Sequence, residues 1–173
     1  MPCVSGYRQQ LNIGVIARMK PAKRYSDLMS ELLNELTEMT NSVDVPVGAL
    51  VLDKYLKVIA KSFNNRVEKN DPTSHAEIEV IRIAGQKLNN WRLDDCTLIV
   101  TLEPCQMCSG AILQSRISRV VFGAFEPKSG FLVSRNSNPD NTNIEIISGV
   151  MEEESSKILS NWFRDKRSNK DMI

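Results

Sequence analysis

The spacing of hydrophobic residues changes in the first third of the chain, from a helical period to an extended one. Over residues 25–40, apolar side chains recur every three or four positions opposite acidic ones, which predicts an amphipathic helix that packs on a sheet. Two β-rich runs follow at residues 45–52 and 56–63, and the segment Asp53-Lys54-Tyr55 between them predicts a short turn. We therefore expect the two runs to pair as a β-hairpin.

A second helix is predicted to begin in the segment Asp71-Pro72-Thr73-Ser74. Ser or Thr here can supply the N-cap, and Glu77, three residues after Ser74, occupies the place of a capping-box partner. Asn89 and Asn90 are expected to end this helix. Its buried stripe is predicted to consist of Ile78, Ile81, Ile83 and Leu88.

The second half of the chain alternates strands and helices. The run at residues 97–102 is largely apolar on both faces, which predicts a central strand covered by helices above and below. Pro104 suits the first turn of the next helix, because its missing N–H would have no intrahelical partner there. This alternation predicts an α/β fold with a five-stranded mixed sheet. The other predicted elements are the body of that helix to about residue 115, strands at 119–122 and 144–147, and a helix over 152–166.

Composition and net charge leave the predicted fold unchanged and indicate the number of domains and the cellular compartment. A chain of 173 residues with 42% hydrophobic content can form one domain with its own core. We place this domain at residues 24–170, after a tail at residues 1–23 that has no periodicity. The sequence shows neither a membrane-length apolar run nor a signal-peptide pattern, so we expect a cytoplasmic protein. A net charge of +1 neither requires nor excludes a nucleic acid partner.

Four cysteines are present, and only Cys105 and Cys108 are close together in the sequence. Such a pair favours metal binding or redox chemistry over a disulfide framework. We expect Cys96 to lie in the core, and Trp162 and Phe163 to pack rather than to stack on a base.

Two segments combine residue types that bind metals, and each lies where a helix is predicted to begin: His75-Ala76-Glu77 and Pro104-Cys105-Gln106-Met107-Cys108. Cys105 and Cys108 share one helical face with β-carbons about 5–6 Å apart, so both sulfurs can reach one zinc ion. His75, the only histidine in the chain, is the third expected ligand. Three protein ligands with one open position are typical of catalytic zinc sites.

Glu77 is the predicted catalytic residue. It follows His75 by two positions, on the same expected helical turn. At a catalytic zinc site the pKa of the bound water falls to about 7, and a carboxylate within reach can move that water's proton to the substrate.

These segments resemble the H-x-E and P-C-x-x-C signature of the cytidine and nucleotide deaminase superfamily. Within it, the chain is similar to the TadA-type tRNA adenosine deaminases from about residue 25 to residue 167. The similar segments are V-P-V-G-A-L-V (45–51), F-N-N-R (63–66), D-P-T-S-H-A-E (71–77), T-L-E-P-C-Q-M-C-S-G-A (101–111) and S-R-I-S-R-V-V-F-G-A (115–124).

The resemblance implies a three-layer α/β/α fold, one zinc ion per subunit, and conversion of the wobble adenosine of a tRNA anticodon stem-loop to inosine by a homodimer. It also implies that Asn64 contacts the flipped nucleoside, and that Val47 and the backbone of Ala76 line the pocket. Glu126 keeps the acidic character of a family aspartate and is the fourth expected substrate contact.

The chain departs from the family at positions where the family grips its RNA. Phe125 stands where the family has an arginine, and Thr142 and Asn143 replace a histidine and an arginine. Loss of these basic groups predicts weaker phosphate contacts.

Three other functions remain open at this point. A deaminase of free guanine, cytosine or nucleosides would use the same zinc site. A thiol oxidoreductase would use the C-x-x-C pair alone. A zinc module that only binds RNA would have no need for Glu77.

Overall fold

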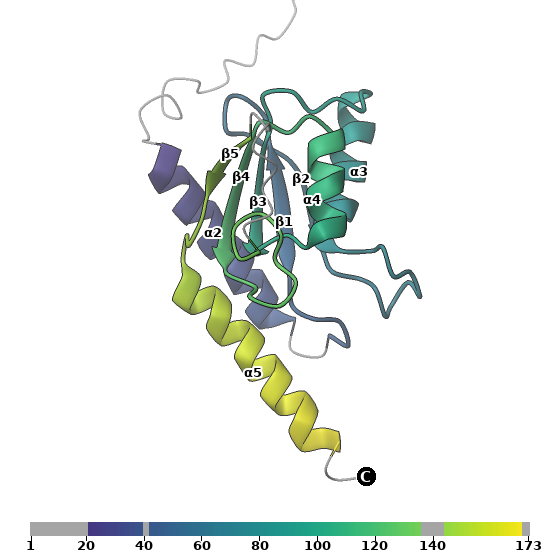
Figure 1. Ribbon diagram of the computed structural model, residues 1–173, viewed down its shortest axis with the longest axis vertical. Helices are drawn as coiled ribbons and strands as arrows, with labels where there is room; N and C mark the ends of the chain where they lie inside the picture. The colour runs from purple at the N-terminus through teal and green to yellow at the C-terminus, as the bar shows by residue number, and fades with distance from the viewer. Residues whose placement is uncertain (1–20, 40–41, 136–143, 171–173) are drawn as a thin grey trace, which may run out of the picture.

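The computed structural model describes residues 21–39, 42–135 and 144–170 (Figure 1). Residues 1–20 of the expected tail lie outside the described residues, as do the departures at Thr142 and Asn143. The elements, in chain order, are α2 (Pro21–Glu38), β1 (Gly48–Leu52), β2 (Val58–Phe63), α3 (Ala76–Leu88), β3 (Thr97–Leu102), α4 (Gln106–Gln114), β4 (Arg119–Ala124), β5 (Glu145–Ile147) and α5 (Glu152–Lys170).

The five strands form one mixed sheet in the order β2-β1-β3-β4-β5. β1 pairs antiparallel with both β2 and β3, whereas β3, β4 and β5 run parallel to one another. β3 therefore lies at the centre, and it is buried along most of its length. The predicted hairpin, the central strand and the mixed sheet are confirmed.

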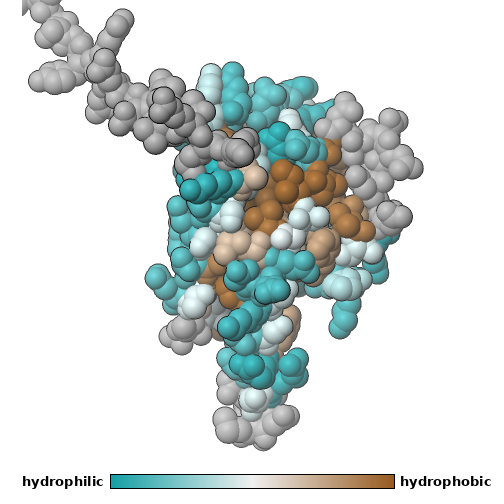
Figure 2. All heavy atoms as spheres, turned by 90° about the vertical axis from the view of Figure 1, so that its left-hand side faces the viewer, coloured by the Kyte–Doolittle hydropathy of each residue, from teal (hydrophilic) through white to brown (hydrophobic). Residues whose placement is uncertain are grey.

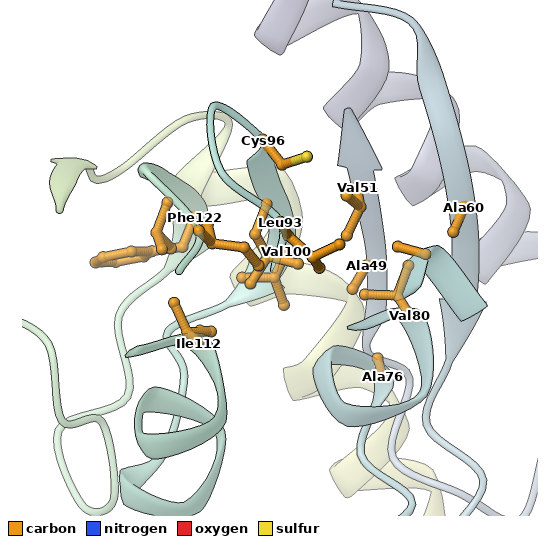
Figure 3. Packing of buried hydrophobic residues seen from close by; sticks show 14 of the residues in the cluster. Ala49, Val51, Ala60, Ala76, Val80, Leu93, Cys96, Val100, Ile112 and Phe122 are labelled. Atoms are coloured by element: carbon orange, nitrogen blue, oxygen red, sulfur yellow. The ribbon is translucent and has the colours of Figure 1, made fainter. Parts of the chain in front are cut away.

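Helices cover both faces of this sheet, with α2 and α5 on one side and α3 and α4 on the other (Figure 1). Because side chains alternate along a strand, each strand contributes to two cores. Ile99 and Val121 pack with the helix α2 residues Leu28 and Leu32. On the opposite face, a cluster under α3 and α4 includes Val51, Val80, Val100, Ile112 and Phe122 (Figure 3). The fold is therefore the three-layer α/β/α arrangement that the sequence led us to expect.

The capping box predicted for α3 does not form. His75 is the N-cap, and no side chain hydrogen-bonds there. The hydroxyl of Ser74 instead donates to Glu79 at 2.9 Å, because the helix begins one residue later than the sequence pattern indicated. Glu77 is thus free for another role.

The buried stripe of α3 also differs from the prediction. Leu88 is 44% exposed and Ile78 is only partly buried, whereas Ile81 and Ile83, although partly buried, pack against the core cluster as predicted. The apolar residues that face the sheet are Ala76, Val80 and Ala84, spaced four apart, whose small side chains let the helix lie close to β1 and β2.

Other boundaries shift by a few residues. α2 begins at Pro21 rather than at residue 25, and β4 continues to Ala124. Pro104 lies before the N-cap Cys105 of α4 rather than in its first turn. Cys96 is buried in the cluster that contains Leu98 and Val100, as expected.

Seen from the side of α2, β5 and α5, the surface is mostly hydrophilic but has an apolar area near its middle (Figure 2). β5 is an edge strand on this side, and its Ile146 and Ile147 are only partly buried. Within the described residues, no helix is both long and apolar enough to cross a bilayer.

Replacing Ala84 with leucine should destabilise the protein by about 1–3 kcal/mol, because the added atoms have no room between α3 and the sheet. Replacing the exposed Leu88 with alanine should change the free energy of unfolding by only about 0.5 kcal/mol. Urea unfolding of both variants measures these effects. A larger loss of stability in Leu88→Ala would indicate that Leu88 belongs to the buried stripe, as predicted from the sequence.

Candidate active site

Two helix N-termini bring together the predicted metal ligands. His75 is the N-cap of α3 and Cys105 is the N-cap of α4, both with extended backbone, and neither side chain caps its own helix. Cys108 lies in the first turn of α4. α3 and α4 pack against each other, so His75 meets the two cysteines, which follow it by 30 and 33 residues in the sequence.

The ligand atoms lie at distances suited to a shared ion. Nδ1 of His75 is 3.7 Å from the sulfur of Cys105 and 3.4 Å from the sulfur of Cys108. All three ligand atoms lie within 4.8 Å of one another, and the group could hold a metal ion.

The electrostatics of this group favour an anionic sulfur. The pKa of the Cys105 thiol is lowered to about 4, first by a hydrogen bond from Cys108 and then, against burial, by one from His75. The pKa of Cys108 is raised because it donates to Cys105 and is desolvated. The pKa of His75 is raised mainly by its hydrogen bond with Cys105. A thiolate is the form in which cysteine binds metals.

Glu77 lies beside the His75, Cys105 and Cys108 group, in the first turn of α3. Its side chain is 4% exposed, and burial raises the pKa of its carboxyl because desolvation penalises the charged form. A carboxylate with a raised pKa is a better proton acceptor near neutral pH than an exposed one.

The predicted site residues line one pocket of about 220 Å³. Cys108 is the exception, because its side chain is fully buried and does not line the pocket. The pocket is lined by Val45, Val47, Asn64, Arg66, His75, Ala76, Glu77, Leu102, Glu103, Cys105, Glu126, Ser129, Leu159 and Phe163.

Asn64 presents an unused hydrogen-bond acceptor at this pocket. Its side-chain amide nitrogen donates to the carbonyl of Val45 at 3.1 Å, and its backbone N–H donates to the carbonyl of Val47 at 2.9 Å. The side-chain oxygen of Asn64 is buried and has no donor within the described part of the chain. Since buried polar atoms are almost always paired, this oxygen is available to a ligand.

Several pocket residues were missed by the reasoning from sequence. Arg66 and Ser129 lie in loops, and Leu159 and Phe163 come from α5. Phe163 packs on Trp162 as expected, with ring centroids 5.0 Å apart, but it is 44% exposed and also borders the pocket. The spacing of Leu159 and Phe163, one helical turn apart, was the only signal that they share a face.

Phe125, where the resemblance led us to expect a basic residue, packs inward. Its ring meets that of Phe122 edge-to-face at 5.2 Å, and it contacts the core cluster under α3 and α4. Among the described residues that line the pocket, Arg66 is therefore the sole arginine or lysine.

Glu79 anchors the loop that joins Asn64 to His75. Its carboxylate is paired with Lys69 at 2.6 Å and with Arg82 at 3.0 Å, and it accepts a hydrogen bond from the hydroxyl of Ser74. The hydrogen bond from Lys69 is the main cause of the lowered pKa of Glu79, and burial opposes it. Lys69 and Ser74 thus tie the loop to α3.

Comparison with known proteins identifies the class of this site. The family model of the MafB19-like deaminases matches residues 24–167. The chain is 39% identical to a tRNA-specific adenosine deaminase of Haemophilus influenzae, over 88% of this chain and 92% of that protein. It is 47% identical to one of Agrobacterium fabrum, over 72% of this chain and 84% of that protein.

A solved structure of a tRNA deaminase that edits adenosine to inosine at the wobble position matches with a TM-score of 0.69 and 41% identity, covering 77% of this chain and 99% of the other. The fold and the match place the chain among the deaminases. More particularly, the chain belongs to the family of tRNA-specific adenosine deaminases. This membership favours a deaminase over the thiol oxidoreductase considered above.

Replacing Cys105 with alanine should reduce bound metal from about one ion per chain to nearly none, because two ligands hold an ion poorly. Cys96→Ala is the matched control, since Cys96 is a core cysteine outside the cluster and its loss should leave the metal content unchanged. Elemental analysis after dialysis gives the stoichiometry. Equal metal content in the two variants would contradict the assignment.

The lowered pKa of Glu79 predicts a pH-dependent contribution to stability. A carboxyl with a lower pKa in the folded than in the unfolded state stabilises fully above its ordinary value of 4.5, and this contribution is lost as pH falls through the folded pKa. Unfolding free energies of wild type and Glu79→Gln should therefore differ most near neutral pH and converge in acid. A gap for Glu79→Gln that persists in acid would refute the prediction.

Proposed function

We propose that this protein hydrolyses the exocyclic amine of the wobble adenosine in a tRNA anticodon, which yields inosine and ammonia. The observation that carries this proposal is the group of His75, Cys105 and Cys108 beside the buried Glu77, at one pocket of a chain that belongs to the tRNA-specific adenosine deaminases.

We propose zinc, one ion per subunit, as the metal of this site. Bonds of about 2.1 Å to nitrogen and about 2.3 Å to sulfur at tetrahedral angles place the two ligand atoms about 3.6 Å apart. His75 Nδ1 lies 3.7 and 3.4 Å from the two sulfurs, so the residues fit this ion. When bound, zinc would lower the pKa of a water at its open position to about 7 and so supply the nucleophile.

Glu77 is proposed to be the proton carrier. Its carboxylate takes a proton from the water that attacks C6 of the purine and delivers it to the ring nitrogen beside that carbon. The carboxylate then carries the proton of the new C6 hydroxyl to the exocyclic amine, the C6–N bond breaks and ammonia leaves. One water is therefore consumed for each ammonia released. The buried position of Glu77 and its raised pKa suit both the acceptance and the return of a proton.

We propose that Asn64, Val47, Ala76 and Glu126 bind the nucleoside. Asn64 has an unpaired acceptor at the pocket, and Val47 and Ala76 are buried apolar residues of its wall. Glu126 is only partly buried and lies in the loop after β4, which also lines the pocket. Deaminases that act on nucleic acids take a base that is single-stranded or has left its stack, which favours the anticodon loop over a duplex.

We further propose that the tRNA anticodon stem-loop is the partner, that two copies form a homodimer, and that the protein acts in the cytoplasm. The names of its relatives support the RNA substrate. Arg66, beside the pocket, is suited to contact a phosphate. The apolar area in Figure 2 is a type of surface that a second copy can cover.

The decisive experiment incubates zinc-loaded protein with an anticodon stem-loop that carries adenosine at the wobble position and measures inosine by mass spectrometry. Wild type should produce inosine, and Glu77→Gln should lower kcat by about 10²–10⁴-fold, because the amide cannot carry the proton. Glu68→Gln, which changes an exposed carboxylate outside the pocket, is the matched control and should retain full turnover.

The same preparations should be given free guanine, cytosine, cytidine and adenosine. Turnover of a free base or nucleoside, without inosine formation in the stem-loop, would replace this proposal with the small-molecule deaminase. RNA binding without any turnover would support the zinc module that only binds RNA.

A further inference from the structure

The loop after β4 folds back onto the beginning of α4. Gly130 forms an isolated β-bridge with Cys105, and the backbone N–H of Phe131 donates to the carbonyl of Pro104 at 3.0 Å. Glu126 and Ser129, from the same loop, line the pocket. One wall of the pocket is therefore a loop whose position depends on its contacts with the segment that carries Cys105.

Glu103 lies between this loop and β3. Its side chain is 2% exposed, and its backbone N–H continues the sheet by donating to the carbonyl of Ala124 at 2.9 Å. One carboxylate oxygen accepts the backbone N–H groups of Val133 and Ser134, each at 2.8 Å. The other accepts the backbone N–H of Glu126 at 3.2 Å and the hydroxyl of Ser134. Four donors from both ends of one loop thus converge on one carboxylate.

A carboxylate only accepts hydrogen bonds, so the three backbone N–H groups and the hydroxyl around Glu103 are matched donors for its two oxygens. Hydrogen bonds to a charged acceptor are stronger than those to a neutral one.

Gly130 shows how closely the loop surrounds this carboxylate. A β-carbon at this position would collide with the carboxylate of Glu103 and would lie 2.6 Å from the carbonyl oxygen of Glu126. The backbone N–H of Gly130 donates to that same carbonyl at 2.7 Å. Only glycine allows the loop to turn against Glu103 in this way.

We propose that Glu103 is a positioning residue that sets the substrate-binding wall of the pocket. Although Glu103 borders the pocket, both of its oxygens are engaged by the loop, so it acts through Glu126 and Ser129 rather than on the substrate. The inference rests on the proposed function, because the wall matters only if the pocket binds the nucleoside.

The test is Glu103→Gln, which keeps the shape of the side chain but replaces one acceptor oxygen with an NH₂ group. Two of the four loop donors then lose their acceptor. We expect KM for the anticodon stem-loop to rise by about tenfold or more, as the loss of a charged hydrogen bond implies. kcat should change by less than about threefold, since Glu77 and the metal ligands are untouched.

Two further variants perturb the contacts between the loop and Glu103 from the side of the loop. Ser134→Ala removes one donor and should raise KM by a smaller factor, and Gly130→Ala should raise KM because the added carbon displaces the loop. Glu154→Gln, an exposed carboxylate on α5, is the control and should leave both constants unchanged.

Hydrogen exchange and metal content give readouts that do not depend on activity. In Glu103→Gln the amides of Glu126, Val133 and Ser134 should exchange faster, while the amides of α3 and the zinc content stay as in wild type. Unchanged exchange with unchanged KM would overturn the proposal, as would a loss of zinc with a fall in kcat alone. If wild type forms no inosine, the proposed function fails, whereas the exchange measurement still decides whether Glu103 holds the loop.

Discussion

The convergence of two helix N-termini is the constraint on which this site depends. α3 and α4 lie on the same face of the sheet, and each has a predicted metal ligand in its N-cap position. His75 and Cys105 have extended backbone, and their side chains make no capping hydrogen bond to their own helices. The two side chains are therefore free to meet. The positive ends of both helices also favour the anionic sulfur that a metal requires. Small displacements of either helix would separate the three ligands.

Two buried carboxylates hold the loops around this centre. Glu79, on α3, holds the loop before His75 through Lys69 and Ser74, and Glu103 holds the loop after β4 through backbone N–H groups. A loop that borders a polar pocket cannot be fixed by apolar packing alone, because its own amides need partners. A multiply bonded carboxylate satisfies several of these amides at once. Two sides of the pocket are therefore held by electrostatic contacts.

Much of the fold could be predicted from periodicity and turn residues. The alternation in residues 97–102 is absent because both faces of β3 are covered, and the pattern indicated this correctly. The stripe of α3 was wrong because large residues such as Ile78 and Leu88 were assumed to be inside, whereas Ala76 and Ala84 allow the close approach to the sheet. Hydrophobicity reports which residues avoid water, but it does not report how near two backbones can come.

The chemistry of the candidate site was determined by local sequence, since His75, Glu77, Cys105 and Cys108 occur in two short segments that each begin a helix. The resemblance also implied Val47, Asn64, Ala76 and Glu126 as pocket residues, whereas only the tertiary structure revealed the rest of the walls. Phe163 reaches it from α5, and Glu103 receives donors from a loop about 30 residues away. Such partners leave no mark on local spacing, because a helical or strand period specifies which face of an element is buried and not which distant segment will cover it.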